Sequence, residues 1–286
     1  MKLNKDMNIL IVGLGLLGGS YAEALKKQGY KVSAITRSRS SVDFALEKGI
    51  IDYGTTLVEP ELVGKADLVV FALYPHIFLE WINQNQRLFK SGAVLTDVTG
   101  VKGCIVEAVQ DALRDDVEFI AAHPMAGREV CGVENSGAEI FKGANFIVVP
   151  TPKNTFGAVE LCRDLGEKLG FYQISELSVE LHDKMIAFLS QLTHCIAVSL
   201  MCCNYTPDLE YYTGDSFRDL TRIARINDEM WSELFLDNKQ ALLAEMERFR
   251  KSFDELYQKI SSGDRDGIRG MMRLSTERRK RFDKTV

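Results

Sequence analysis

A glycine-rich segment near the N-terminus is the first feature with a chemical meaning. Gly13, Gly15 and Gly18 follow the apolar run 8–12 in a G-x-G-x-x-G spacing and open a helical pattern. In that context the first glycine permits a tight turn, the second lets the backbone approach a pyrophosphate, and the third lets helix and strand pack closely. The start of the helix offers free N–H groups and a partial positive charge to phosphate. The segment therefore predicts a dinucleotide site, whose expected contacts are Gly13, Leu14, Gly15, Leu16, Leu17 and Gly18.

The end of the next expected strand, 31–35, bears on which dinucleotide binds. A site for NAD usually has an acidic residue there, which binds the ribose 2′-hydroxyl. This chain has two arginines among small hydroxyl residues instead, and no carboxylate before Asp43. Because guanidinium groups suit a 2′-phosphate, we predict a preference for NADP over NAD. A solvated basic loop that tolerates either cofactor is the alternative. The expected contacts are Thr36, Arg37, Ser38 and Arg39.

Polar residues follow two later strands at positions where a substrate could bind. Thr99 and Gly100 come after one apolar run, and His123 follows the run 118–122, which we expect Pro124 to end. Ligands of doubly wound sheets bind beyond the carboxyl ends of the strands, so these residues should face the cofactor. A histidine there could accept a substrate proton while hydride moves to the cofactor. A lone histidine is more often structural, so this position alone leaves its role open.

The elements that must position these residues change in character near residue 176. Strand patterns alternate with helical patterns up to that point, which predicts crossover units and a mostly parallel, doubly wound sheet. From Ser178 onward the periodicity is helical. We therefore predict an α/β domain over residues 1–176 and an all-α domain over residues 177–286. The expected helices of the second domain cover 178–203, 216–225, 228–260 and 264–283.

Composition excludes several other classes of protein. The 286 residues are 46% hydrophobic and 26% charged, which fits two packed globular domains. A net charge of −5 lacks the basic footprint of nucleic-acid binding. Six cysteines without a C-x-x-C pair predict reduced thiols, no metal site and a cytoplasmic location. The apolar run 185–203 is long enough to span a membrane, but polar residues interrupt it. We therefore predict a buried core helix and no membrane partner, with a membrane span as the less favoured alternative.

Four segments, in order along nearly the whole chain, resemble the prephenate/arogenate dehydrogenase family of tyrosine biosynthesis. The two most specific segments contain His123 and Arg222, and the glycine segment is less specific. The matching residues are GLGLLGGS at 13–20, HPMAGRE at 123–129, His182-Asp183 with His194, and FRDLTRIA at 217–224 followed by Met230-Trp231.

The resemblance implies a Rossmann-type α/β domain followed by a helical dimerisation domain, and a homodimer. It also implies an oxidative decarboxylation of prephenate or arogenate, in which hydride leaves C4 and the ring becomes aromatic as CO2 departs. His123 would deprotonate the ring hydroxyl, Arg222 would hold a carboxylate and His194 would contact the substrate. Many members have a serine where Gly100 stands, and Thr99 is the neighbour that could replace its hydroxyl. The other implied site residues are Trp231, in the pocket wall, and Glu129, as a supporting or gating group.

Helical spacing favours His194 over His182 as the substrate contact. Asp183 and His194 are eleven residues apart, near three turns, so they share a face from which His182 is rotated. For His194 the alternative is a hydrogen-bonded core histidine. For Arg222 it is a salt bridge to Asp219.

Two other functions remain open from the sequence. A dehydrogenase of the β-hydroxyacid or imino-acid reductase kind would share the two-domain plan, but commonly uses a lysine-centred helix motif. The stretch after Lys184 lacks the asparagine that such a site pairs with its lysine. A catalytically silent NADP-binding sensor would keep the glycine segment but would not need His123 and Arg222. The length also predicts that no C-terminal ACT domain follows the helices.

Overall fold

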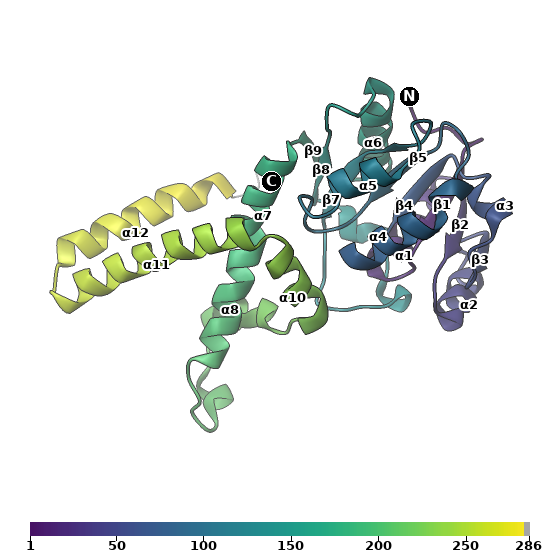
Figure 1. The fold of residues 1–286 in the computed structure, drawn as a ribbon. Helices are drawn as coiled ribbons and strands as arrows, with labels where there is room; N and C mark the ends of the chain where they lie inside the picture. The colour runs from purple at the N-terminus through teal and green to yellow at the C-terminus, as the bar shows by residue number, and fades with distance from the viewer. Residues whose placement is uncertain (283–286) are drawn as a thin grey trace. The chain divides into compact units, whose positions relative to one another are not determined.

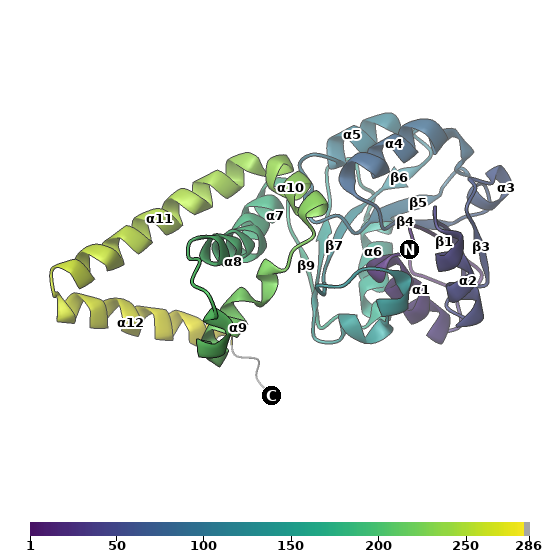
Figure 2. The same cartoon turned by 90° about the horizontal axis from the view of Figure 1, so that it is seen from below.

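The structure is a computed structural model that describes residues 1–282 (Figures 1 and 2). Two compact units are present, Met1–Asn238 and Lys239–Val286. The last expected helix, 264–283, ends at Asp283, which lies outside the described residues.

A parallel sheet of six strands forms the centre of the first unit, in the order β3-β2-β1-β4-β5-β6. This is the strand order of doubly wound dinucleotide-binding sheets, so the predicted fold class is confirmed. All four residues of β4 are buried, as expected for a sheet covered on both faces. The strands are β1 Asn8–Val12, β2 Lys31–Ile35, β3 Tyr53–Thr55, β4 Leu68–Phe71, β5 Val94–Asp97 and β6 Glu118–Phe119.

Helices cover both faces of this sheet, and alternate strand residues supply the two cores (Figure 2). Ile9 and Ile11 of β1 join the core that contains side chains of α1 and α6. Leu10 and Val12 point to the opposite face and join the core that contains side chains of α4 and α5. The helices are α1 Leu16–Lys27, α2 Arg39–Glu47, α3 Pro60–Val63, α4 Pro75–Asn85, α5 Val106–Ala112 and α6 Phe156–Leu169.

The predicted strand 118–122 is wrong, because the chain there belongs to two different sheets. β6 ends at Phe119, and β7, Ala121–Met125, is the edge strand of a separate sheet in the order β7-β8-β9. Pro124 therefore lies inside a strand and does not end it. Proline is tolerated on an edge strand because that strand has one side without ladder partners. The partner strands are β8 Asn145–Val149, antiparallel to β7, and β9 Gln173–Glu176, parallel to β8.

A long apolar helix follows β9 and carries two of the predicted site segments. It comprises α7 Val179–Ile186, a π-helical turn Ala187–Gln191 and α8 Leu192–Cys202. By length and composition alone it could cross a membrane, with a mean hydropathy of 1.7. Only 28% of its most apolar stretch is buried within the chain. The predicted buried core helix is therefore wrong for the single chain.

The remaining elements are all helical, and from residue 177 to residue 282 the structure contains no strand, as predicted. The expected helix 228–260 is two helices, because the chain leaves helical geometry at Asn238. In the second unit Gly263 adopts a left-handed φ of 70°, and the side chain of Asp264 caps the following helix. These helices are α9 Asp215–Thr221, α10 Asp228–Asp237, α11 Lys239–Ser261 and α12 Arg265–Arg279, with a 3-10 turn at Arg222–Ala224.

Candidate active site

The glycine turn after β1 has the geometry that its sequence predicts. Gly13 has a φ of 101°, and its N–H donates to the carbonyl of Ile35 at 2.8 Å. A Cβ on Gly13 would lie 2.4 Å from the carbonyl oxygen of Ala72, and one on Gly18 would lie 1.9 Å from that of Gly13. Both positions therefore need glycine for the turn itself, whatever binds there.

Gly15 differs, because the protein leaves open space where its side chain would be. It is the N-cap of α1 without a side-chain capping bond, and a Cβ there would have no neighbour within 4 Å. The first N–H groups of α1 consequently have no capping side chain over them. Leu14 is buried beneath this turn, whereas Leu16 and Leu17 are partly exposed. The open space and the helix N-terminus fit the pyrophosphate of a dinucleotide.

The loop after β2 lies beside this turn through the Gly13–Ile35 bond. The Ser38 hydroxyl caps α2, and Thr36 pairs by its backbone with Thr55. Arg37 is exposed. Arg39 is also exposed, but its guanidinium pairs with Asp43 at 2.9 Å, so one of the two expected phosphate ligands has a carboxylate partner of its own.

A fully buried ion pair joins the loop after β5 to β7. The Nζ of Lys102 lies 2.6 Å from Oδ2 of Asp97 and 2.6 Å from the carbonyl oxygen of Ala122. The other oxygen of Asp97 accepts the N–H of Ala122 at 3.1 Å. Burial lowers the pKa of Lys102, and the nearby Asp97 carboxylate opposes that shift. This clamp fixes the backbone immediately before His123.

The hydroxyl of Thr99 contacts both members of this buried ion pair. That hydroxyl donates to Asp97 and lies within hydrogen-bond distance of Lys102, and the residue is buried. Gly100 is more open, because a Cβ there would meet only Leu234, at 3.5 Å. A role for Thr99 as a replacement hydroxyl toward substrate stays a prediction, and in this conformation its proton is directed to Asp97.

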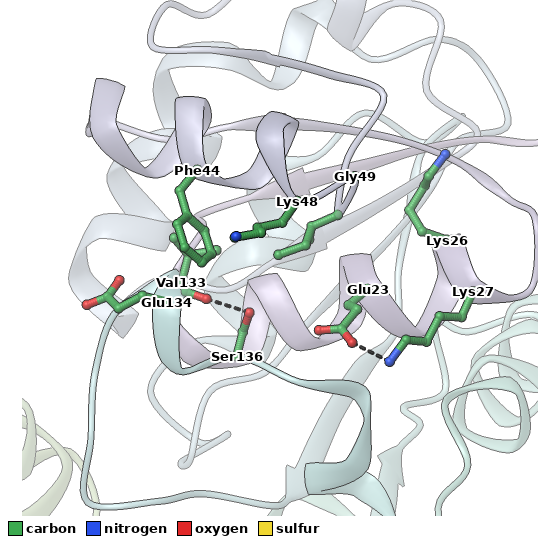
Figure 3. Close-up of a pocket in the computed structure, with 10 residues that line it drawn as sticks. Glu23, Lys26, Lys27, Phe44, Lys48, Gly49, Val133, Glu134 and Ser136 are labelled. Carbon is green, nitrogen blue, oxygen red and sulfur yellow. Dashed lines mark hydrogen bonds and ion pairs between the residues drawn. The ribbon is translucent and has the colours of Figure 1, made fainter.

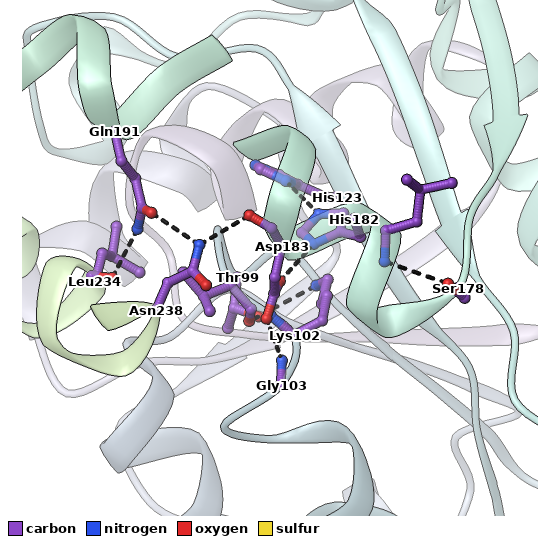
Figure 4. Close-up of polar contacts among 12 residues, drawn as sticks. Thr99, Lys102, Gly103, His123, Ser178, His182, Asp183, Gln191, Leu234 and Asn238 are labelled. Carbon is purple, nitrogen blue, oxygen red and sulfur yellow. Dashed lines mark hydrogen bonds and ion pairs between the residues drawn. The ribbon is translucent and has the colours of Figure 1, made fainter. Parts of the chain in front are cut away.

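His123 is partly buried and contacts a second histidine, as Figure 4 shows. Its Nδ1 lies 2.9 Å from Nε2 of His182, and Nδ1 of His182 lies 2.7 Å from Oδ1 of Asp183. Asp183 also accepts the backbone N–H groups of Lys102 at 2.9 Å and Gly103 at 2.7 Å. Burial, with the nearby His182 and Lys102, lowers the pKa of His123 well below its usual value. Burial also lowers the pKa of His182, although Asp183 partly compensates.

The contact between His182 and His123 was missed because the helix is irregular. The expected alignment of Asp183 with His194 assumes 3.6 residues per turn throughout. The π-helical turn at Ala187–Gln191 lies between them and changes the phase. Within that turn Gln191 donates to the carbonyl of Leu234 at 2.7 Å and accepts from Asn238 at 2.8 Å. These buried amides hold α10 against the helix (Figure 4). Leu234 of α10 is the side chain that a Cβ on Gly100 would meet.

Four other predicted site residues form two pairs, one of stacked rings and one of opposite charges. The ring of His194 stacks on Trp231 with 3.7 Å between centroids, and its Nδ1–H donates to the carbonyl of Ser190 at 2.8 Å. Burial lowers the pKa of His194. Arg222 forms an exposed ion pair with Glu129, four residues after β7, and not with Asp219. One helix thus brings His182 to His123 and His194 to Trp231.

A pocket in another part of the unit is lined by the ends of α1 and α2 (Figure 3). It contains Phe44 and Lys48, together with Lys27, which pairs with Glu23. None of the residues that line it belongs to the predicted site. Within residues 1–282, no three histidine, cysteine or acidic side chains are placed to hold a metal ion.

Two of the three motif glycines in the turn, Gly15 and Gly18, give a matched pair of variants. Gly18→Ala should lower the free energy of unfolding by about 1–3 kcal/mol, because its Cβ meets backbone. Gly15→Ala should change stability by less than about 1 kcal/mol. It should still weaken NAD(P) binding by about tenfold, or ~1.4 kcal/mol, because its Cβ fills the cradle. Denaturant unfolding and calorimetric titration measure both quantities. Unaltered cofactor affinity in Gly15→Ala would place the pyrophosphate elsewhere.

Lys102→Met tests the buried clamp. Loss of one partner leaves the Asp97 carboxylate buried without its cation, so the free energy of unfolding should fall by about 3–5 kcal/mol. Lys153→Met is the control, since Lys153 pairs with Asp111 at the surface and should contribute about 0–1 kcal/mol. Urea unfolding followed by circular dichroism compares the two. A loss in Lys102→Met no larger than in the control would show that the pair does not stabilise the fold.

Comparison with known proteins supplies the family. The model of the prephenate dehydrogenase nucleotide-binding domain matches residues 21–174. The model of the prephenate dehydrogenase dimerization domain matches residues 178–274. The glycine turn itself precedes the first matched residue, so the family match and the cofactor motif are separate observations.

Individual relatives agree with the domain models. The chain is 31% identical to a prephenate dehydrogenase of Lactococcus lactis over 91% of its own length and 73% of that protein. It is also 31% identical to a cyclohexadienyl dehydrogenase of Zymomonas mobilis, over 91% of this chain and 90% of that one. The prephenate dehydrogenase of Aquifex aeolicus, solved with hydroxyphenyl propionate and NAD+, superposes with a TM-score of 0.90 at 30% identity, covering 99% of this chain and all of that one. The chain belongs to the prephenate dehydrogenase family.

Proposed function

We propose that this member of an NAD(P)-dependent oxidoreductase family converts prephenate to 4-hydroxyphenylpyruvate and CO2, with arogenate as the alternative substrate. The observation that carries the proposal is the placement of His123. Lys102 and Asp97 fix its strand at the carboxyl end of β5. Gly13 lies at the same edge of the sheet, against the residue that follows β4. A proton acceptor and a cradle for the cofactor therefore share the edge where ligands of such sheets bind.

The chain's own task in this reaction is to orient the substrate and to hold one proton. A nicotinamide cofactor held at the glycine turn would supply the acceptor for the hydride of ring C4. His123 accepts the proton of the C4 hydroxyl, and its lowered pKa keeps it neutral for that purpose. CO2 leaves with the loss of the ring carboxylate, and aromatisation supplies the driving force. Positioning, rather than activation of a nucleophile, is then the main contribution of the protein.

Arg222 is proposed to bind a substrate carboxylate. Its guanidinium is exposed and already pairs with a carboxylate, that of Glu129. A substrate anion can take over that interaction because an exposed ion pair is weak. The stacked rings of His194 and Trp231 would form the wall beside it, with the free Nε2 of His194 available to the substrate.

The preference for NADP over NAD is also a proposal. Its support is the loop after β2, where Arg37 and Arg39 are exposed and where no acidic side chain occurs before Asp43. A phosphate can compete with Asp43 for Arg39 because that pair lies at the surface.

We also propose a cytoplasmic homodimer formed through the helical part of the chain. The dimerization-domain match covers the helix α7–α8, whose large apolar side chains are exposed in the single chain. Phe188, Leu189 and Met201 are each about half exposed. Burial of such side chains against a second copy stabilises by roughly 25 cal/mol per Å². Light scattering of the purified protein measures the assembly, and a monomer would contradict this proposal.

The decisive experiment is an assay of two substrates with two cofactors. Prephenate and arogenate are each incubated with NAD or NADP, and reduced cofactor and aromatic product are measured. Turnover of either substrate supports the proposed function, and no turnover in any combination contradicts it.

His123→Asn should lower kcat by about 10²–10⁴-fold while cofactor affinity is kept. In the wild type, kcat/KM should decline only below pH 6.5, because the pKa of His123 is lowered.

Arg222→Gln tests carboxylate binding. The substrate KM should rise about tenfold to hundredfold, equivalent to ~1.5–3 kcal/mol for a hydrogen bond to a charged group. Arg163→Gln is the control, because Arg163 on α6 also pairs with a glutamate, Glu176, outside the predicted site, with its side chain 35% exposed against 63% for Arg222. Steady-state kinetics of both variants decide the matter. An equal KM in the two variants would remove Arg222 from the substrate site.

A double variant tests the cofactor preference. Arg37→Ala with Arg39→Ala should raise the KM for NADP by about tenfold or more, because two cations near the 2′-phosphate are lost. The KM for NAD is the internal control and should stay within about twofold, since NAD has no such phosphate. An unaltered NADP KM would refute the assignment of these arginines.

A further inference from the structure

Three side chains in a row determine where the protons of the site lie. Nδ1 of His123 faces Nε2 of His182 at 2.9 Å, and Nδ1 of His182 faces Oδ1 of Asp183 at 2.7 Å. Asp183 accepts two further backbone N–H groups, from Lys102 and Gly103. A carboxylate in that role has only acceptor atoms to offer, so Nδ1 of His182 must be the donor.

The direction of the second hydrogen bond follows from the first. A neutral imidazole carries one proton, so His182 with its proton on Nδ1 has a lone pair on Nε2. His123 must then donate its Nδ1–H to that lone pair. Its remaining nitrogen, Nε2, is left without a proton. Burial lowers the pKa of both rings, which favours the neutral forms that this assignment requires.

We propose that His182 is a positioning residue that holds His123 in the tautomer with its proton on Nδ1, so that Nε2 presents a lone pair to the substrate. Asp183 holds His182 in turn, through a carboxylate anchored on the loop at Lys102 and Gly103. This inference rests on the proposed function, in which His123 accepts the hydroxyl proton. The function itself requires only a basic nitrogen, whereas the inference states which nitrogen it is and which residue selects it.

The same arrangement accounts for the charge that forms in the reaction. When Nε2 of His123 takes the hydroxyl proton, the O–H bond breaks and the ring becomes an imidazolium. The Nδ1–H bond to His182 is kept, and no other bond in the row needs to break. The anionic Asp183 at the far end compensates the new charge through His182, which is an orienting role of the kind that carboxylates have in catalytic triads.

Nitrogen-15 spectroscopy of the full-length protein tests the tautomer without reference to any substrate. The chain has four histidines, so selective labelling and single-histidine variants assign each ring. At pH 8 we expect His123 and His182 both to carry their proton on Nδ1. His182→Leu should move the proton of His123 to Nε2, and His182→Gln should keep it on Nδ1, because the amide oxygen can accept. A wild-type His123 protonated on Nε2 would overturn the proposal, even if neither variant folds.

Kinetics then test whether the tautomer matters. His182→Leu should lower kcat by about 10²-fold or more, the kind of loss that follows a wrong histidine tautomer, with the substrate KM within about threefold. His182→Gln should recover most of that loss. Lys184→Gln is the control, since Lys184 is exposed on the same helix and should behave as wild type. Equal losses in the Leu and Gln variants would contradict the proposal.

The spectroscopic and the kinetic experiments together separate this inference from the proposed function. If the wild type turns over neither prephenate nor arogenate, the proposed function fails, and the spectra still decide whether His182 selects the tautomer of His123. If turnover is normal but His123 carries its proton on Nε2, the function stands and the inference fails.

Discussion

The ammonium group of Lys102 is buried completely, and the groups around it satisfy that charge. Desolvation of an ammonium ion costs several kcal/mol unless a counter-ion and hydrogen-bond acceptors are held close. Asp97 and the carbonyl of Ala122 provide them, each at 2.6 Å. Because Asp97 ends a strand of the main sheet and Ala122 lies in β7, the first strand of the second sheet, the buried pair connects the two sheets. The position of His123, the next residue along the chain, depends on this contact.

Local spacing made much of the fold predictable. The glycine turn, the alternation of strands with helices and the change to helices alone near residue 176 can all be read within windows of about twenty residues. The second sheet could not be predicted in this way, because the residues of β7 pair with residues of β8 that are twenty or more positions away. The pairs between β8 and β9 are at least as far apart along the chain. Pro124 suggested the end of a strand because its place on a sheet edge depends on which strands pair, not on the neighbouring residues.

The site shows the same division between local and non-local information. His123, Arg222 and Glu129 were predicted from motifs, and the structure adds that Arg222 and Glu129 form an ion pair. His182 was passed over because a helical wheel cannot register a π-helical turn, which depends on buried amide contacts from α10. Asp97 and Lys102 carried a weak signal, an acid and a base five residues apart after an apolar run. Only burial distinguishes such a pair from an ordinary surface one.

The charged groups of the candidate site fall into two sets, one buried and one exposed. The buried set suits groups that fix geometry, and the exposed set suits groups that bind anionic ligands. Asp97, Lys102 and Asp183 are buried and hold fixed partners, which suits groups that define geometry. Arg39 and Arg222 are exposed and pair with carboxylates at the surface. Exposed pairs contribute only about 0–1 kcal/mol, so an anionic ligand can replace the carboxylate at little cost. A negatively charged chain can thus present Arg39 and Arg222 to anionic ligands while each arginine has a carboxylate partner in the absence of ligand.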